Sequence, residues 1–231
     1  AGFSRPIDQN DTTAPNLYDL AKEKGYTLAA GYADATKQLG SGKMILLPSN
    51  YRDKYTSYAG ALPYAIDRTS ADLTLSQIVE VAIAQLSSYD RFFMMAEGGK
   101  IDYASHANDG ATVLHEVMDF DAAIQVAYRF YEQHPDETLI VITADHETGG
   151  MALGNSDYVL NLKVLANQQC SLDKLSDQLS ELHKKEGEKL QWEQVKHLIS
   201  ANTGLYTQVE MTREEDALLQ EAFASMMSHQ D

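Results

Sequence analysis

The sequence predicts an α/β protein with a mostly parallel sheet that helices cover on both faces. The first observation is that apolar runs of strand length alternate with helical patterns over residues 1–154. The second is that chemically reactive side chains follow directly after two of these runs, at the strand ends where α/β sheets bind ligands. The third is that residues 155–231 carry helical patterns without a strong strand between them, which indicates a helical insertion or cap.

The first elements read as a helix followed by two strands. A helix is predicted over Leu17–Lys24, where Asn16 can cap its start and Gly25 can end it. The short apolar runs Tyr26–Ala30 and Met44–Leu47 are predicted strands.

Two further helices each lead into an apolar run. A capping box of Thr74 and Gln77 starts a predicted helix at Leu75, and the continuous apolar run Phe92–Ala96 follows as a buried strand. The next predicted helix precedes a strand over Leu139–Ala144. Its apolar face is expected to carry Val113, Val117, Phe120, Ile124, Ala127 and Tyr131. Beyond residue 155, helices are predicted over Leu172–Lys185, Trp192–Ser200 and Arg213–Met227.

Composition narrows the function classes. The chain has 231 residues, which is enough for one large domain or for a domain with an appendage. Its formal charge of −16 argues against nucleic acid or an anionic membrane surface as a partner, although an acidic surface can also serve solubility alone. Cys170 is the only cysteine, so any bound metal must use histidine and carboxylate ligands. No apolar run is long enough to span a bilayer, and the first residues do not read as a signal peptide.

One candidate metal motif follows the predicted strand 92–96. It reads Glu-Gly-Gly-Lys-Ile-Asp-Tyr-Ala-Ser-His over residues 97–106. Asp102 and His106 are four residues apart, so on a helical turn both side chains reach one face and can share an ion such as zinc. The alternative is an ordinary loop with a solvated acid and a surface histidine.

A second candidate motif, Thr-Ala-Asp-His-Glu-Thr-Gly-Gly, occupies residues 143–150. Asp145 and His146 follow the predicted strand 139–144, and at a strand end the chain turns so that both can converge on a metal. A capping aspartate and a hydrogen-bonded histidine would explain the same residues.

The two motifs, in this order and spacing, resemble those of the alkaline phosphatase family. The similarity is strongest over residues 92–154 and extends to Asn16–Tyr26 and to the predicted helix that contains Ile78 and Ile83. It implies an alkaline-phosphatase-like three-layer α/β/α sandwich, present in part, with a mostly parallel sheet. Residues 1–154 would form the partial core that carries the metal motifs, and residues 155–231 the helical insertion or cap.

The resemblance also implies a set of metal ligands. Glu97 would bind magnesium, Asp102 and His106 one zinc ion, and Asp145 and His146 a second. Two zinc ions and one magnesium ion serve phosphomonoester hydrolysis through a phosphoserine intermediate in this family. Tyr103, beside the expected ligand Asp102, would be a tuning residue near bound phosphate.

Several family features are absent from the sequence. The nucleophilic serine stands in an Asp-Ser-Ala motif, which these 231 residues lack, and so no catalytic residue is assigned. Thr69-Ser70-Ala71 is the nearest lookalike, but it reads as a helix-entry loop. The phosphate-clamping arginine and a late His-Thr or His-Ser motif are also missing, and His229 reads as a terminal surface histidine. We therefore expect a carboxyl-side portion of a longer phosphatase that is inactive alone.

The expected partners are small-molecule phosphate monoesters, without nucleic acid or membrane. By resemblance, the parent enzyme would be a periplasmic or secreted homodimer. Two other readings remain open: a non-catalytic metal-binding module, and a sulfatase or phosphodiesterase of the same superfamily.

Overall fold

The computed structural model describes residues 13–49, 62–152 and 162–228. The chain divides into two compact units. The first unit comprises Ala1–Gly99 and Glu116–Asp145, and the second comprises Lys100–His115 and His146–Asp231. Among the helices of the described ranges, none is both long and apolar enough to cross a membrane.

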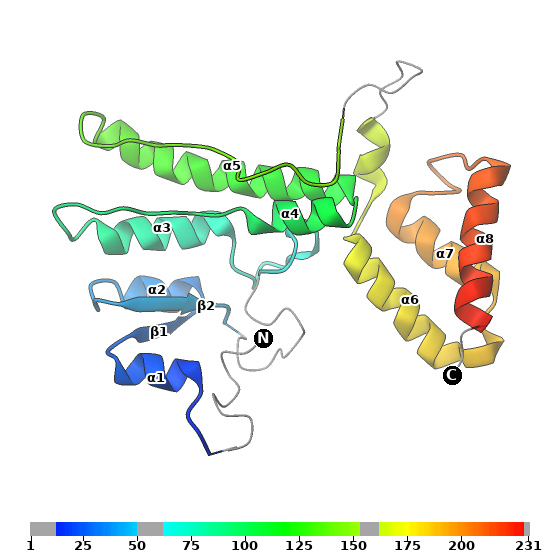
Figure 1. Ribbon diagram of the computed structural model, residues 1–231, viewed down its shortest axis with the longest axis horizontal. Coiled ribbons are helices and arrows are strands. Elements are labelled where there is room, and N and C mark those ends of the chain that lie inside the picture. The colour runs from blue at the N-terminus through cyan, green and yellow to red at the C-terminus, as the bar shows by residue number, and fades with distance from the viewer. Residues whose placement is uncertain (1–12, 50–61, 153–161, 229–231) are drawn as a thin grey trace. The chain divides into compact units, whose positions relative to one another are not determined.

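The first unit begins with an α/β arrangement close to the predicted one. Its elements are α1 (Leu17–Glu23), β1 (Thr27–Ala30), α2 (Tyr32–Lys37) and β2 (Met44–Leu47). The Asn16 side chain accepts a hydrogen bond of 2.9 Å from the Asp19 amide, as expected of a helix cap. β1 and β2 pair in parallel with Thr27 opposite Met44, and α2 makes the crossover between them. Figure 1 shows α1 and α3 on opposite sides of the two strands.

Helix α3 (Leu75–Leu86) completes the small core of this unit. Ala29, Ala35 and Val81 are buried together, from β1, α2 and α3 respectively. The predicted capping box is present, because Thr74 accepts from the Gln77 amide and Gln77 accepts from the Thr74 amide. The sequence therefore places this helix start correctly.

Two predicted strands do not form. Residues 92–96 and 139–144 have no strand assignment and appear as plain trace in Figure 1. Within the described part of the chain, no backbone hydrogen bond pairs either run with a neighbouring strand. Most of their apolar side chains are exposed to solvent, with exposed fractions of 89% at Phe93 and 86% at Leu139. Strand pairing depends on partners distant in sequence, and apolar composition alone does not supply them.

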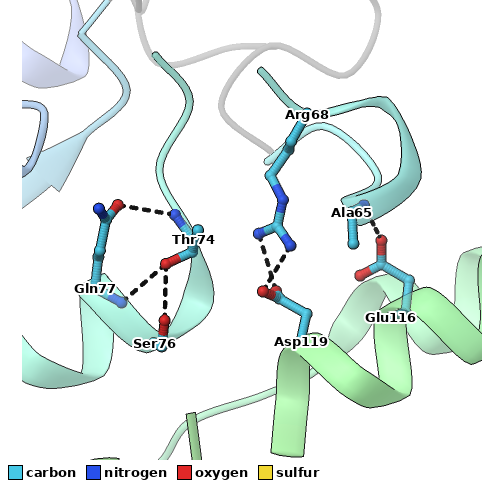
Figure 2. A network of polar contacts seen from close by, with 7 residues as sticks. All are labelled: Ala65, Arg68, Thr74, Ser76, Gln77, Glu116 and Asp119. Atoms are coloured by element: carbon cyan, nitrogen blue, oxygen red, sulfur yellow. Dashed lines mark hydrogen bonds and ion pairs between the residues drawn. The ribbon is translucent and has the colours of Figure 1, made fainter. Parts of the chain in front are cut away.

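Helix α5 (Gly110–Gln133) is longer than its neighbours, and most of its expected apolar face is half-buried: Val113, Phe120, Ile124, Ala127 and Tyr131. Val117, which the sequence assigned to the apolar face, is 45% exposed, whereas Glu116 and Ala123 are buried. Figure 2 shows the partners of two acidic residues on this helix. Glu116 accepts a 2.5 Å hydrogen bond from the Ala65 amide, and Asp119 forms a two-point ion pair with Arg68. These contacts offset the free-energy cost of burying the two carboxylates.

The described part of residues 155–231 is helical, as predicted. It contains the short 3₁₀ segments η2 (Leu162–Asn167) and η3 (Gly187–Lys189), and the helices α6 (Leu172–Glu186), α7 (Trp192–Thr203) and α8 (Arg213–Ser228). Leu190, Val195 and Ile199 form its core, against which Trp192 and Phe223 pack. The predicted boundary between residues 154 and 155 lies outside the described residues.

Asp109 fastens the start of α5 to the start of α6 within the second unit. Its buried carboxylate accepts hydrogen bonds of 2.7 Å from the Thr112 hydroxyl, the Gln168 amide side chain and the Leu172 backbone amide. One carboxylate thus satisfies donors at two helix starts.

Candidate metal centre

The first motif lies on helix α4 (Gly99–His106). Asp102 and His106 stand one turn apart, and the Oδ1 atom of Asp102 lies 3.5 Å from Nε2 of His106. The side chain of His106 is 70% exposed and that of Asp102 is 35% exposed. The helical spacing that suggested a shared ion is therefore realised in the structure.

The donor pair has the separation that a small cation needs. Two ligands that bind one tetrahedral zinc ion at about 2.0 Å lie roughly 3.3 Å apart. The observed 3.5 Å between the carboxylate oxygen and the imidazole nitrogen is close to that separation. Carboxylate oxygen and imidazole nitrogen are also ligand types that zinc accepts. The separation of these two donor atoms is consequently compatible with a shared zinc ion.

Thr148 joins the second motif to the first. Its hydroxyl donates a 2.6 Å hydrogen bond to Oδ1 of Asp102 and lies 3.1 Å from Nδ1 of His146. The same Nδ1 atom lies 3.1 Å from the backbone carbonyl oxygen of Glu147. Contacts of 3.5, 2.6 and 3.1 Å therefore connect His106, Asp102, Thr148 and His146 in succession.

Gly149 allows the second motif to approach α4 this closely. Its φ of 82° lies in the left-handed region, and a Cβ atom there would stand 2.5 Å from the carbonyl oxygen of Ser105. The Gly150 amide donates a 2.6 Å hydrogen bond to Oε1 of Glu147, which closes the turn. A glycine is thus required where the turn touches the helix backbone.

The structure brings some of the predicted ligands together and leaves others as predictions. Asp102, His106 and His146 belong to the second unit, whereas Glu97 and Asp145 are exposed residues of the first. Within the described ranges, no group of three or more His, Cys, Asp or Glu side chains is arranged to hold a metal ion. Convergence of all five residues on one site therefore remains a prediction.

Other residues singled out in the sequence have ordinary surroundings. Tyr103 lies on α4 and is 50% exposed, and Nζ of Lys100 is 5.5 Å from the centre of its ring. Ser70 is exposed in the turn before α3, where the Thr69 hydroxyl and amide bond to Asp72. His229 lies outside the described residues.

Sequence reasoning missed Thr148 and Gly149. Neither residue type is a usual metal ligand, and Thr148 meets Asp102 across 46 positions of sequence. A signal was nevertheless present, because Thr148 directly follows His146-Glu147 and precedes two glycines. Hydroxyl groups beside candidate ligands are common orienting partners.

Comparison with known proteins gives a consistent picture. The family model described as alkaline phosphatase matches residues 16–227. The chain is 35% identical over 162 residues to the repressible alkaline phosphatase of Saccharomyces cerevisiae, and 36% identical over 140 residues to alkaline phosphatase 3 of Bacillus subtilis. These matches cover 63% and 60% of this chain but only 29% and 28% of those proteins. The matched part of the chain thus spans about three tenths of the length of these two relatives.

Solved structures agree on the fold. A crystal structure of a cold-active alkaline phosphatase from a psychrophilic Shewanella species matches with a TM-score of 0.64 and 29% identity, covering 91% of this chain and 46% of that one. The alkaline phosphatase of Thermus thermophilus matches with a TM-score of 0.63 at 24% identity, covering 82% of this chain and 38% of that one, and supports the fold alone. The fold is therefore a partial alkaline-phosphatase-like α/β fold.

Proposed function

Because this chain belongs to the alkaline phosphatase family, we propose that it carries metal-binding motifs of a phosphomonoester hydrolase. The observation that carries the proposal is the junction at Thr148, which connects a carboxylate and a histidine from two separate motifs. The hydrogen bond at this junction links segments that lie 46 positions apart in the sequence. The proposed substrates are small phosphate monoesters.

The proposed ligands follow the chemistry of their donor atoms. Asp102 and His106 hold one zinc ion, and Asp145 and His146 hold a second. Glu97 holds magnesium, because a hard cation prefers carboxylate oxygen. When bound, two zinc ions stabilise the entering and leaving oxygens of phosphoryl transfer.

The chain's own residues prepare this site in a defined way. The Asp102 carboxylate supplies negative charge beside His106, and the Thr148 hydroxyl fixes the orientation of that carboxylate. The exposed ring of Tyr103 offers an apolar face on the same helix, where a cationic residue would strengthen phosphate binding. The attacking serine of the proposed phosphoserine mechanism is not assigned within these 231 residues.

The proposal can be tested in a working relative. The segment of Bacillus subtilis alkaline phosphatase 3 that this chain matches would be replaced by the corresponding 140 residues of this chain. We expect the hybrid to hydrolyse an aryl phosphate at alkaline pH and to contain zinc and magnesium by elemental analysis. His106→Ala in the hybrid should lower kcat/KM by more than about 100-fold, because even outer partners of metal ligands cost roughly 10–100-fold when removed.

The other readings make different forecasts for the same hybrid. If the chain comes from a sulfatase, the hybrid should turn over an aryl sulfate faster than an aryl phosphate. If it comes from a phosphodiesterase, the hybrid should turn over a phosphate diester faster than an aryl phosphate. A non-catalytic module predicts bound metal with no turnover of any ester. His115→Ala, at an exposed position of α5 outside both motifs, serves as the control.

The role of Tyr103 can be measured in the same hybrid. Tyr103→Lys adds a cation beside the proposed phosphate site, and we expect tighter inhibition by inorganic phosphate. An inhibition constant equal to that of the unsubstituted hybrid would reject the role.

We also propose that the complete enzyme is a homodimer and that it is periplasmic or secreted. One curated relative, from Bombyx mori, is named a membrane-bound alkaline phosphatase.

A further inference from the structure

The imidazole of His146 faces two hydrogen-bonding oxygens at one ring nitrogen. The Thr148 hydroxyl oxygen lies 3.1 Å from Nδ1, and the Glu147 carbonyl oxygen also lies 3.1 Å from it. A carbonyl oxygen can only accept a hydrogen bond. The Thr148 hydroxyl has one proton, which it donates to Oδ1 of Asp102 over 2.6 Å, because a carboxylate oxygen cannot donate.

These two facts indicate which nitrogen carries the proton. With its proton directed at Asp102, the hydroxyl of Thr148 can only accept from His146, as the carbonyl of Glu147 must. Both of these oxygens are therefore acceptors toward Nδ1, and the geometry favours Nδ1 as the protonated nitrogen of the neutral ring. The lone pair of the imidazole then resides on Nε2.

We propose that Thr148 is a positioning residue that holds His146 in the Nδ1-protonated tautomer and thereby selects Nε2 as its metal-binding atom. The inference rests on the proposed metal site and deepens it. The hydroxyl of Thr148 orients side chains of both motifs. It donates a hydrogen bond to the Asp102 carboxylate and accepts one from the His146 ring. Such partners of metal ligands fix ring orientation and tautomer in known metal sites.

The neighbouring glycine supports this assignment. Thr148 reaches Asp102 because Gly149 packs against the carbonyl oxygen of Ser105, in the last turn of α4. The side chain of Thr148 is half-buried, whereas the ring of His146 is exposed. The hydroxyl is thus held by the fold, and the ring is oriented by the hydroxyl.

The tautomer can be read without any metal. The 231-residue chain would be labelled with ¹⁵N, and the ring nitrogens of His146 would be observed by long-range ¹H–¹⁵N correlation at a pH where the ring is neutral, with His146→Gln used for assignment. We expect Nδ1 to carry the proton. In Thr148→Val the ratio of Nδ1-protonated to Nε2-protonated ring should fall about fivefold, the effect of one hydrogen bond. Thr148→Ser should restore it, and Thr36→Val, which removes a hydroxyl bonded only within α2, should not change it.

Zinc binding gives the second readout. Zinc chloride would be titrated into the same proteins by calorimetry, and Thr148→Val should weaken binding roughly 10–100-fold, as removal of outer partners does elsewhere. Protonation of His146 on Nε2, or an unchanged tautomer ratio in Thr148→Val, would overturn the inference even if zinc binds. Failure of the unsubstituted chain to bind zinc would count against the proposed metal site instead, and the tautomer measurement would still judge the role of Thr148.

Discussion

One largely buried ion pair is expected to stabilise the first unit. Asp119 on α5 and Arg68 in the segment before α3 have side chains that are each only 11% exposed, and two contacts of 2.6 and 3.0 Å join them (Figure 2). The planar guanidinium matches a carboxylate at two points, which a lysine ammonium cannot do. An ion pair this well enclosed depends strongly on both partners.

Removal of Arg68 should therefore be costly. Arg68→Ala leaves the Asp119 carboxylate enclosed without its cation, and we expect the free energy of unfolding to fall by about 3–5 kcal/mol. Arg68→Lys should lose less, since it keeps the charge but not the second contact. Urea unfolding followed by circular dichroism measures both. Arg129→Ala, at an exposed position of α5, is the matched control, and an equal loss in that variant would contradict the importance of the pair.

Tyr206 provides a residue-scale test by pH. Burial raises the pKa of its phenol to about 12, helped by the hydrogen bond of 2.7 Å that the hydroxyl donates to Asp216 and by the charge of that carboxylate. Because the folded-state pKa lies above the ordinary value of 10, the neutral phenol stabilises the folded state below pH 10. This contribution is lost as the pH rises from 10 towards 12.

The expected result is a difference between two pH profiles. Thermal unfolding of the second unit should become easier above pH 10 in the unsubstituted chain, and part of that decline should be absent in Tyr206→Phe, which has no phenol to ionise. Lys196, whose Nζ lies 4.6 Å from the ring centre, keeps its contact in this variant. Parallel profiles for the two proteins between pH 9 and 12 would show that Tyr206 does not contribute.

At the scale of elements, local signals were sufficient for most helices. Asn16 and the Thr74–Gln77 capping box mark the starts of α1 and α3. They can be read from the sequence because a capping side chain bonds to an amide only three residues further along the chain. Helix α2 escaped prediction since it is only six residues long and starts at Gly31, which offers no side-chain cap. Helical periodicity also located α5 and most of its half-buried apolar face. It did not predict that Glu116 and Asp119 are largely buried as well, because their partners Ala65 and Arg68 lie far away in the sequence.

Strand pairing and the contacts of the candidate site could not be predicted from short stretches of sequence, because both depend on residues far apart in the chain. The apolar runs 92–96 and 139–144 have the composition of strands but lack paired neighbours in the described structure. In the candidate site, the helical spacing of Asp102 and His106 was readable from the sequence. The bond from Thr148 to Asp102 was not, because it joins segments 46 positions apart and follows from a turn that Gly149 makes possible.

The open apolar runs should make the chain associate with itself. Phe93 and Val141 are 89% and 73% exposed, and extended apolar segments with unpaired backbone are sites of aggregation. We expect the double change Phe93→Lys, Val141→Lys to lower the average mass in light scattering at high protein concentration. Gln125→Lys with Gln133→Lys adds equal charge at exposed positions of α5 and controls for solubility. A monodisperse unsubstituted chain, or equal effects of both pairs, would refute the expectation.

The turn of residues 147–150, which packs against α4, contains two glycines, so one can serve as the control for the other. Gly149→Ala combines a left-handed φ with a Cβ atom 2.5 Å from the Ser105 carbonyl oxygen, whereas Gly150→Ala, at a φ of 68°, meets no atom within 4 Å. Gly150→Ala should cost about 1–2 kcal/mol of unfolding free energy through backbone strain. Gly149→Ala should cost more and should also weaken zinc binding, since Thr148 is displaced from Asp102. Equal losses in the two variants would remove the argument for close packing.

At the scale of the whole chain, an acidic protein carries its candidate ligands without an identified nucleophile. The formal charge of −16 favours cations and disfavours polyanions near the surface. The described residues offer the pair Asp102 and His106 at 3.5 Å, but no cluster of three metal-binding side chains. Catalytic zinc sites normally have three protein ligands, and so a pair should hold the ion more weakly.

The last prediction follows from these two properties together. We expect the 231-residue chain by itself to show no appreciable hydrolysis of an aryl phosphate at alkaline pH with zinc and magnesium added. The Asp-Ser-Ala motif is absent from these 231 residues, so we expect no phosphoserine to form, and weak metal binding leaves at most a slow reaction of water. The double variant Asp145→Ala, His146→Ala is the control for contaminating phosphatase. Turnover on the order of 1 per second or faster, typical of working enzymes and abolished in that variant, would require a nucleophile within these residues and would overturn the prediction.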